Sequence, residues 1–147
     1  MIELANFKPE HLVNIKKEDL DARIITFLGN IDMRAEEYAK AGPAVSILDG
    51  ETILSIGGVI NFWPGVGEVW QMLSPEGRLK GLIVYRYMSD FVQRCFNEYG
   101  YHRIQASILY DHKEAHKSIL RLGFIPEGMM VYYGPSKENY IRYAKVK

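Results

Sequence analysis

Four residues near the middle of the chain could together hold an anion. Gly77, Arg78, Lys80 and Gly81 lie in the run LSPEGRLKGLI, residues 73–83. This run joins a predicted strand to the start of the longest predicted helix, where unpaired amides and the helix dipole attract negative charge. The glycines allow close approach to the backbone and the cations add charge. Alternatively, the glycines only shape a turn between solvated cations.

A second run, DHKEAHKSILRLGF at residues 111–124, has the pattern of a helix followed by a tight turn. Ala115, Ile119 and Leu122 share one helix face, and Gly123 can end the helix before Phe124 enters the core. Taken alone, this pattern indicates local structure and no chemistry.

In their order and separation, the two runs resemble the paired signature of the GNAT superfamily. In that family an Arg/Gln-x-x-Gly-x-Gly/Ala turn after the fourth strand wraps the pyrophosphate of an acyl-coenzyme A. An Asn-x-x-Ala helix ending in Leu-Gly-Phe flanks the pantetheine arm. Arg78 and Gly81 match the turn, and the later motif matches at Ala115, Leu122, Gly123 and Phe124. The resemblance covers residues 68–128, and the first third matches only in the order of its elements.

Three positions depart from the family pattern. Ile83 stands where Gly or Ala is usual, which would crowd the phosphate or displace it by a residue. His112 takes the place of the asparagine, and Ile119 stands where many members have a tyrosine proposed as general acid.

The resemblance implies an acyl-CoA-dependent N-acyltransferase, with acetyl-CoA as the expected donor and a small amine or an exposed protein amine as the acceptor. Its backbone amides near Met72 and Leu73 would hold the developing oxyanion. Glu68 is the candidate base, although a solvated glutamate at a strand start explains it equally well. The full set expected to bind the donor is Met72, Leu73, Arg78, Leu79, Lys80, Gly81, Leu82, Ile83, His112 and Ile119.

A different class of function fits the same resemblance. Small GNAT-like proteins without a clear active site occur in bacteriophage genomes, some as virion-associated proteins, and the run GYHRIQA at residues 100–106 is similar to those. Ile83 and Ile119 favour such a catalytically inactive binding or structural module, located in the virion or the host cytoplasm. A nucleotide-binding protein of Rossmann type is disfavoured because the glycine spacing is wrong for a dinucleotide fingerprint.

The hydrophobic pattern predicts the elements that must position these residues. Strands are expected at residues 1–7, 44–48, 52–62, 68–73, 102–110, 129–133 and 140–146, with a hairpin turn at Asp49-Gly50. Helices are expected from Pro9, over 20–41 with a break at Gly29-Asn30 and a second piece at 33–41, over 80–99 and over 114–122. This order predicts an α/β (α+β) fold: one GNAT-like domain over residues 1–147, with a mixed, mostly antiparallel twisted sheet of six to seven strands flanked by about four helices.

Composition narrows the partners. Eighteen basic residues balance 18 acidic ones, so the broad positive field used to bind nucleic acid or anionic membranes is not expected. The single Cys95 excludes an intrachain disulfide and fits a reducing cytoplasm. His112 and His116 lack the companions of a metal site, so no metal is expected. Tyr132 and Tyr133 with the closing strands could support a homodimer.

Overall fold

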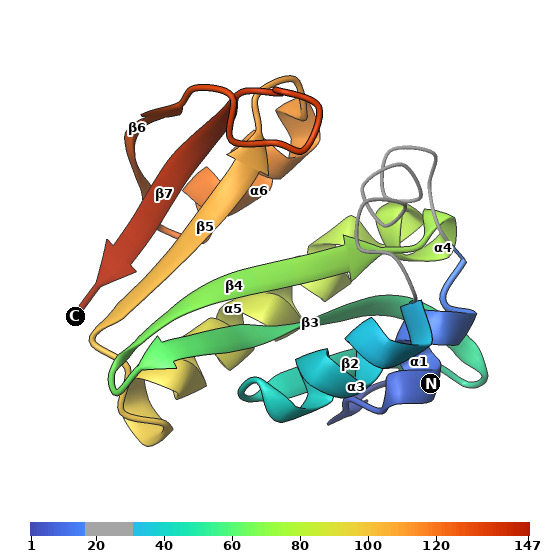
Figure 1. Ribbon diagram of the computed structural model, residues 1–147. Coiled ribbons are helices and arrows are strands. Elements are labelled where there is room, and N and C mark those ends of the chain that lie inside the picture. The colour runs from blue at the N-terminus through green and yellow to red at the C-terminus, as the bar shows by residue number, and fades with distance from the viewer. Residues whose placement is uncertain (17–30) are drawn as a thin grey trace.

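The computed structural model describes residues 1–16 and 31–147, and one seven-stranded sheet runs through them (Figure 1). The predicted helical piece at residues 20–30 lies outside the described residues. In sheet order the strands are β1 (Ile2–Asn6), β2 (Ala44–Asp49), β3 (Thr52–Trp63), β4 (Val66–Leu73), β5 (Arg103–Leu109), β7 (Tyr140–Val146) and β6 (Ile125–Met130). Every neighbouring pair is antiparallel except β4 with β5, which confirms the predicted mixed sheet.

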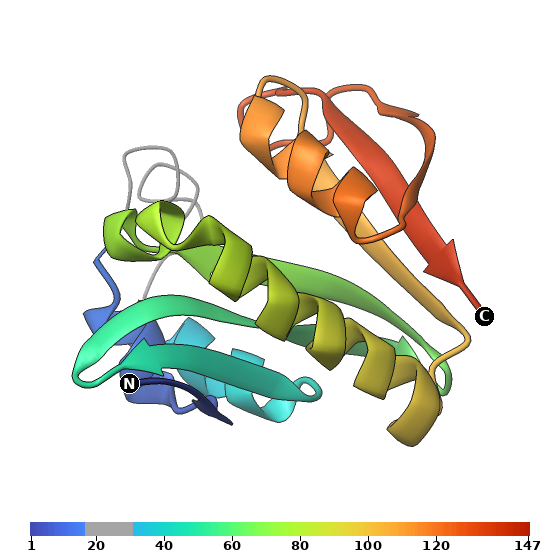
Figure 2. The ribbon, with the colours of Figure 1, turned by 180° about the vertical axis from the view of Figure 1, so that it is seen from behind.

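Helices cover both faces of this sheet. The described helices are α1 (Pro9–Asn14), α3 (Ile31–Lys40), α4 (Pro75–Leu79), α5 (Gly81–Glu98) and α6 (Lys113–Arg121). From behind, α5 lies in front of β3 and β4, and α6 covers β5 and β7 (Figure 2). α1 and α3 pack on the opposite face of β2 and β3 (Figure 1). None of these helices is both long and apolar enough to cross a membrane.

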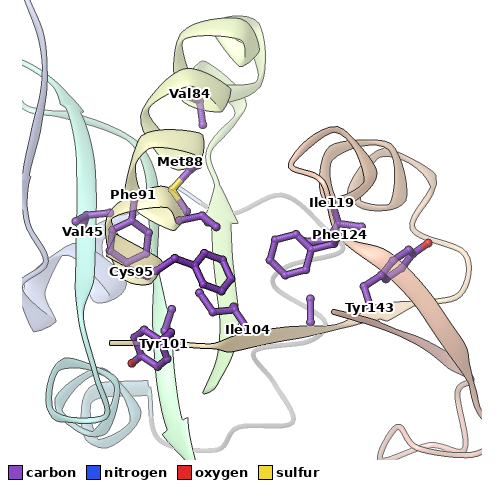
Figure 3. Close-up of a cluster of buried hydrophobic side chains, with 14 of the residues drawn as sticks. Val45, Val84, Met88, Phe91, Cys95, Tyr101, Ile104, Ile119, Phe124 and Tyr143 are labelled. Atoms are coloured by element: carbon purple, nitrogen blue, oxygen red, sulfur yellow. The ribbon is translucent and has the colours of Figure 1, made fainter. Parts of the chain in front are cut away.

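The main core lies between the sheet and the two rear helices. The apolar side of α5, including Val84, Met88 and Phe91, packs against the first half of the sheet. Phe124, with Ile119 of α6 and Tyr143 of β7, lies across from α5 (Figure 3). Ile104 of β5, which is fully buried, lies between the two groups. The core is therefore continuous even though its two halves sit on different strands.

One of the two adjacent glycines of β3, Gly57, marks a close approach of α5 to the sheet. Gly57 and Gly58 keep a regular register with β2, and the register shifts instead beside Ile47 and Leu48. A Cβ at Gly57 would lie 2.8 Å from Cε of Met88. Because Gly57 has no side chain, α5 can pack directly against the strand.

The last hairpin corrects one prediction. The strand predicted at 129–133 is β6 at Ile125–Met130, and the chain turns at Tyr132. Tyr132 has a φ of 58°, which strand geometry excludes, and its N–H donates to Oδ1 of Asn139. β6 tolerates Pro126 because it is the edge strand of the sheet.

The run after β4 corrects another. The sequence predicts a turn between the strand that ends at residue 73 and the helix that begins at residue 80, yet Pro75–Leu79 form the helix α4. Ser74 Oγ accepts from the Gly77 N–H at 3.0 Å and donates to the Leu54 carbonyl at 3.1 Å, while Pro75 sits at the first helical position. The serine thus caps α4 and ties it to β3.

Gly77 and Gly81 should respond oppositely to alanine. At Gly77 an added Cβ would lie 1.9 Å from the Leu54 carbonyl oxygen, whereas at Gly81 nothing lies within 4 Å. We expect Gly77→Ala to lower the free energy of unfolding by about 2 kcal/mol or more, because backbone must shift. Gly81→Ala should leave it unchanged or raise it slightly. Urea unfolding measures both, and equal effects would contradict the packing of α4 on β3.

Candidate functional site

The parallel strands β4 and β5 stay together over only three residue pairs. Val66, Gly67 and Glu68 pair with Arg103, Ile104 and Gln105 in that order. Beyond Glu68 the strands part, and β5 continues to pair with β7 up to Leu109. Figure 1 shows the two strands diverging towards the ends that lead into α4 and α6. In the described parts of the chain, the last five residues of β4 therefore have a strand neighbour on one side only.

The register identifies the amides along this open edge. Ser74 N–H donates to the Leu54 carbonyl, so even-numbered residues of β4 direct their backbone groups towards β3. The Met72 carbonyl agrees, since it accepts from Ser55 Oγ at 3.0 Å. Gln71 and Leu73 consequently direct their N–H groups to the open edge. The amides of Met72 and Leu73 are predicted to hold an oxyanion. The register places the Leu73 N–H on the open edge and directs the Met72 N–H towards β3. The second amide on the open edge belongs to Gln71.

The start of α5 lies next to the end of β4. The amides of Arg78, Lys80 and Ile83 donate to the carbonyls of Ser74, Gly77 and Lys80, and the helical pattern of α4 uses that of Leu79. Within the described residues, the N–H groups of Gly81 and Leu82 have no backbone acceptor. Gly81 is exposed, and the space above its Cα is open. These two amides at the positive end of an 18-residue helix can donate hydrogen bonds to an anion.

The two predicted cations point to different partners. Arg78, at the end of α4, forms an ion pair with Glu114 of α6 and so joins the segments that follow β4 and β5. Lys80 instead donates to Oδ2 of Asp49 at 2.9 Å, on the β2–β3 turn. Asp49 also pairs with the terminal amine of Met1. Of these two cations, Arg78 therefore lies between the segments that follow the parting strands, and Lys80 is bound to the end of β2.

His112 lies beside the Arg78 ion pair, at the cap of α6. Burial lowers the pKa of this imidazole, and the positive charge of Arg78 lowers it further. The side chain of His112 caps no backbone group of the helix. The structure thus places His112 and Arg78, far apart in the sequence, within electrostatic reach.

His116, one turn further along α6, has a structural role. Its Nε2 faces the carbonyl oxygens of Leu109 and Tyr110 at 3.1 and 2.9 Å, so it carries the hydrogen. Nδ1 then accepts from the Tyr143 hydroxyl at 2.7 Å. Both ring nitrogens are used to fix α6 on the ends of β5 and β7.

The two isoleucines that depart from the family motif lie in different surroundings. Ile83, in the first turn of α5, is 37% exposed and packs outside the core. Ile119 is 6% exposed and packs with Phe124 in the main core (Figure 3). A residue at position 119 is therefore a core residue in this chain.

Glu68 lies where β4 and β5 separate, on the sheet face opposite α5. Its Oε1 accepts from Gln105 Nε2 and Ser107 Oγ, both at 3.3 Å, and lies 3.9 Å from Nη2 of Arg142. Among the described residues, Oε2 has no hydrogen-bond partner. The carboxylate is oriented through one oxygen while the other remains available.

Sequence reasoning had missed four of these neighbours: Gln105, Ser107, Glu114 and Arg142. Arg103, Gln105 and Ser107 alternate along a strand with apolar residues, so a polar face could have been read there. The contact of Glu114 with Arg78 depends on how the two helices meet, and no local pattern reveals it. No group of three potential metal ligands occurs in residues 1–16 and 31–147.

Solved structures supply the comparison. No family model matches the sequence, and no curated protein matches it. A spermidine N-acetyltransferase SpeG chimera from Vibrio cholerae and hSSAT is 18% identical, with a TM-score of 0.78 over 99% of this chain and 95% of that one. A GNAT-family acetyltransferase from Bacillus anthracis is 14% identical, with a TM-score of 0.76 over 99% and 94%. A putative phosphinothricin N-acetyltransferase is 15% identical, with a TM-score of 0.78 over 99% and 98%.

The electrostatic contact between Arg78 and His112 can be tested by titration. In Arg78→Gln we expect the pKa of His112 to rise towards 6.5 but to remain below it, because burial persists. Since the folded-state pKa is depressed, this imidazole favours unfolding as the pH falls through its titration range, in both proteins. NMR titration of the ring proton measures the midpoint, with Arg94→Gln as control. An unchanged pKa of His112 in Arg78→Gln would show that the two side chains do not interact electrostatically.

Proposed function

Because the chain has the GNAT fold, we propose that it is an acyl-CoA-dependent N-acyltransferase, with acetyl-CoA as donor and an amine as acceptor. The observation that carries the proposal is the open edge of β4, bounded by the start of α5 and by Arg78. An edge with unpaired amides, an anion-binding helix start and a carboxylate meet there. Acyl transfer from a phosphate-bearing thioester needs all three.

The pyrophosphate of the donor would lie against the Gly81 and Leu82 amides. Gly81 fits this role because no atom would contact a side chain there, so a ligand oxygen can approach the backbone. Arg78 would add a charge-assisted hydrogen bond once it exchanges Glu114 for phosphate. Leu79, Lys80 and Ile83 would border the phosphate without donating, since their amides are already bonded.

The open edge would hold the reacting carbonyl. A thioester supplies an activated acyl group, and the amides of Gln71 and Leu73 would stabilise the negative charge that develops on its oxygen. Backbone donors on a strand that β3 fixes from the other side need little reorganisation during the reaction. Met72 would shape the opposite sheet face, and His112 the side of the site near Arg78.

Glu68 would accept a proton from the ammonium group of the acceptor through Oε2, directly or through a water, and so convert it to the neutral amine that attacks. The neutral amine nitrogen then bonds to the acyl carbon as the carbon–sulfur bond breaks, and the proton that this nitrogen must lose passes to the departing thiolate of CoA, which leaves as the thiol. We propose direct attack of the amine on the thioester. Cys95 lies in the core, where burial raises the pKa of its thiol to about 12. That cysteine cannot serve as an acyl carrier.

Binding of acetyl-CoA should depend on Arg78 and Glu114 in opposite senses. By isothermal titration calorimetry, we expect Arg78→Gln to weaken binding about ten-fold, because one charged hydrogen bond to phosphate is lost. Glu114→Gln should tighten it, since Arg78 no longer has to leave a carboxylate. Arg94→Gln, which breaks an exposed ion pair on α5, is the matched control and should bind as wild type. Absence of binding by wild-type protein at millimolar acetyl-CoA would leave the inactive module as the better account.

The role of Glu68 predicts a split between kinetic constants. Glu68→Gln keeps the side-chain shape but cannot accept the proton, so kcat for acetylation should fall by about a hundred-fold or more. The affinity for acetyl-CoA should stay unchanged, because Glu68 lies on the other sheet face from the phosphate. Steady-state release of CoA, with calorimetry as control, measures both. Full activity in this variant would remove Glu68 from the mechanism.

A further inference from the structure

Arg142 lies beside Glu68 with part of its hydrogen-bonding capacity unused. It is on β7 opposite Ser107, and its Nη2 is 3.9 Å from Glu68 Oε1, beyond hydrogen-bond distance. Its Nε is buried and has no hydrogen-bond partner among residues 1–16 and 31–147. Leaving a buried N–H of a charged group unpaired is costly, and ligands commonly satisfy such groups.

The charges around Arg142 leave one cation and one anion for a ligand. Arg103 and Glu127 satisfy each other through two parallel hydrogen bonds, one of 2.9 Å and one of 2.5 Å. Glu68 is held by the neutral groups of Gln105 and Ser107. Glu68 and Arg142 form only a long ion pair with each other, of 3.9 Å, so their opposite charges lie side by side where β4 and β5 separate.

A second buried donor lies on the same face. Trp70 follows Glu68 by two residues on β4, so both side chains lie on one side of the strand. Its indole Nε1 is buried and, within the part of the chain that the structure describes, has no hydrogen-bond partner. Trp70 packs against Tyr38 of α3, with ring centroids 4.8 Å apart, and burial raises the pKa of that tyrosine. Two such donors thus share the sheet face of the Glu68 carboxylate, one on β4 itself and one on β7.

From these groups we infer that the acceptor is an α-amino acid, whose ammonium pairs with Glu68 and whose carboxylate pairs with Arg142. An α-amino acid carries both charges on one carbon, which matches two protein charges only 3.9 Å apart. Guanidinium binds carboxylate through parallel N–H groups, and Nε is one of the donors for that geometry. The inference rests on the proposed acyl transfer and names its substrate class.

A polyamine fits this face less well. Several ammonium groups need several available carboxylates, but Glu127 is already engaged by Arg103 and only Glu68 is left in the described cluster. Arg142 would also repel a polycation near its reacting end. The same charge penalises any amine that offers nothing to the guanidinium.

Matched pairs of amines test the inference. Each pair is an amino acid and its decarboxylated amine: lysine with cadaverine, arginine with agmatine, phenylalanine with phenethylamine, and tyrosine with tyramine. We expect wild-type protein to favour the amino acid in the best pair by about ten-fold or more in kcat/KM, because the carboxylate forms charged hydrogen bonds. Calorimetry of the same compounds in the presence of CoA gives a readout that does not depend on turnover.

Variants of Arg142 assign the preference to its guanidinium. Arg142→Met should reduce binding of the amino acid about ten-fold and leave its decarboxylated partner unchanged or bound more tightly. Arg142→Lys should retain part of the preference, because it keeps the charge and loses the paired donors. Arg94→Gln serves as control and should keep all of it. Thermal melting of each variant confirms that it is folded.

Two results would overturn the inference. One is wild-type protein that prefers the decarboxylated member of every pair or binds no amino acid at millimolar concentration. The other is an Arg142→Met variant that loses both members of a pair equally. Failure of the proposed acyl transfer is a separate result, seen as absent acetyl-CoA binding. Amino-acid binding that only Arg142 variants lose would support the site even then.

Discussion

The site depends on how briefly β4 and β5 pair. Three residue pairs hold the strands together, and then β5 follows β7 while β4 stays with β3. A fully paired parallel sheet would use every amide of β4 in its ladder. Here Gln71 and Leu73 keep theirs, and the core continues behind the open edge because Phe124 and Ile104 fill it from the far side. Open backbone is thus retained inside a stable sheet.

The segments after the two strands complete the arrangement on either side. Ser74 and Gly77 hold α4 against β3, so the chain reverses sharply and α5 begins next to the end of β4. His116 holds α6 against the carbonyl ends of β5. The ion pair between Arg78 and Glu114 then spans from one segment to the other. The acyl donor would bind at this junction, and the acceptor amine would bind on the polar face around Glu68 and Arg142.

Local pattern predicted most of the fold because its signals are local. Alternating apolar residues with an Asp49-Gly50 turn predicted the β2–β3 hairpin, and the apolar side of residues 80–99 predicted α5. Ser74 and Pro75 favour the start of a helix at α4, but Gly77 favours a turn, so a turn is predicted there. Gly77 is needed instead for a tertiary contact, the close approach of α4 to the Leu54 carbonyl. The same holds for Arg142, whose importance follows only from the register of β7 on β5.

A structure of the protein with bound CoA tests the central claim most directly. The account predicts that the pyrophosphate accepts hydrogen bonds from the Gly81 and Leu82 amides, with the thiol end along Gln71 and Leu73 of the open β4 edge. Arg78 should have exchanged Glu114 for phosphate. CoA bound elsewhere would contradict the account, for example in the surface hollow of about 680 Å³ lined by Leu4, Arg94 and Tyr99.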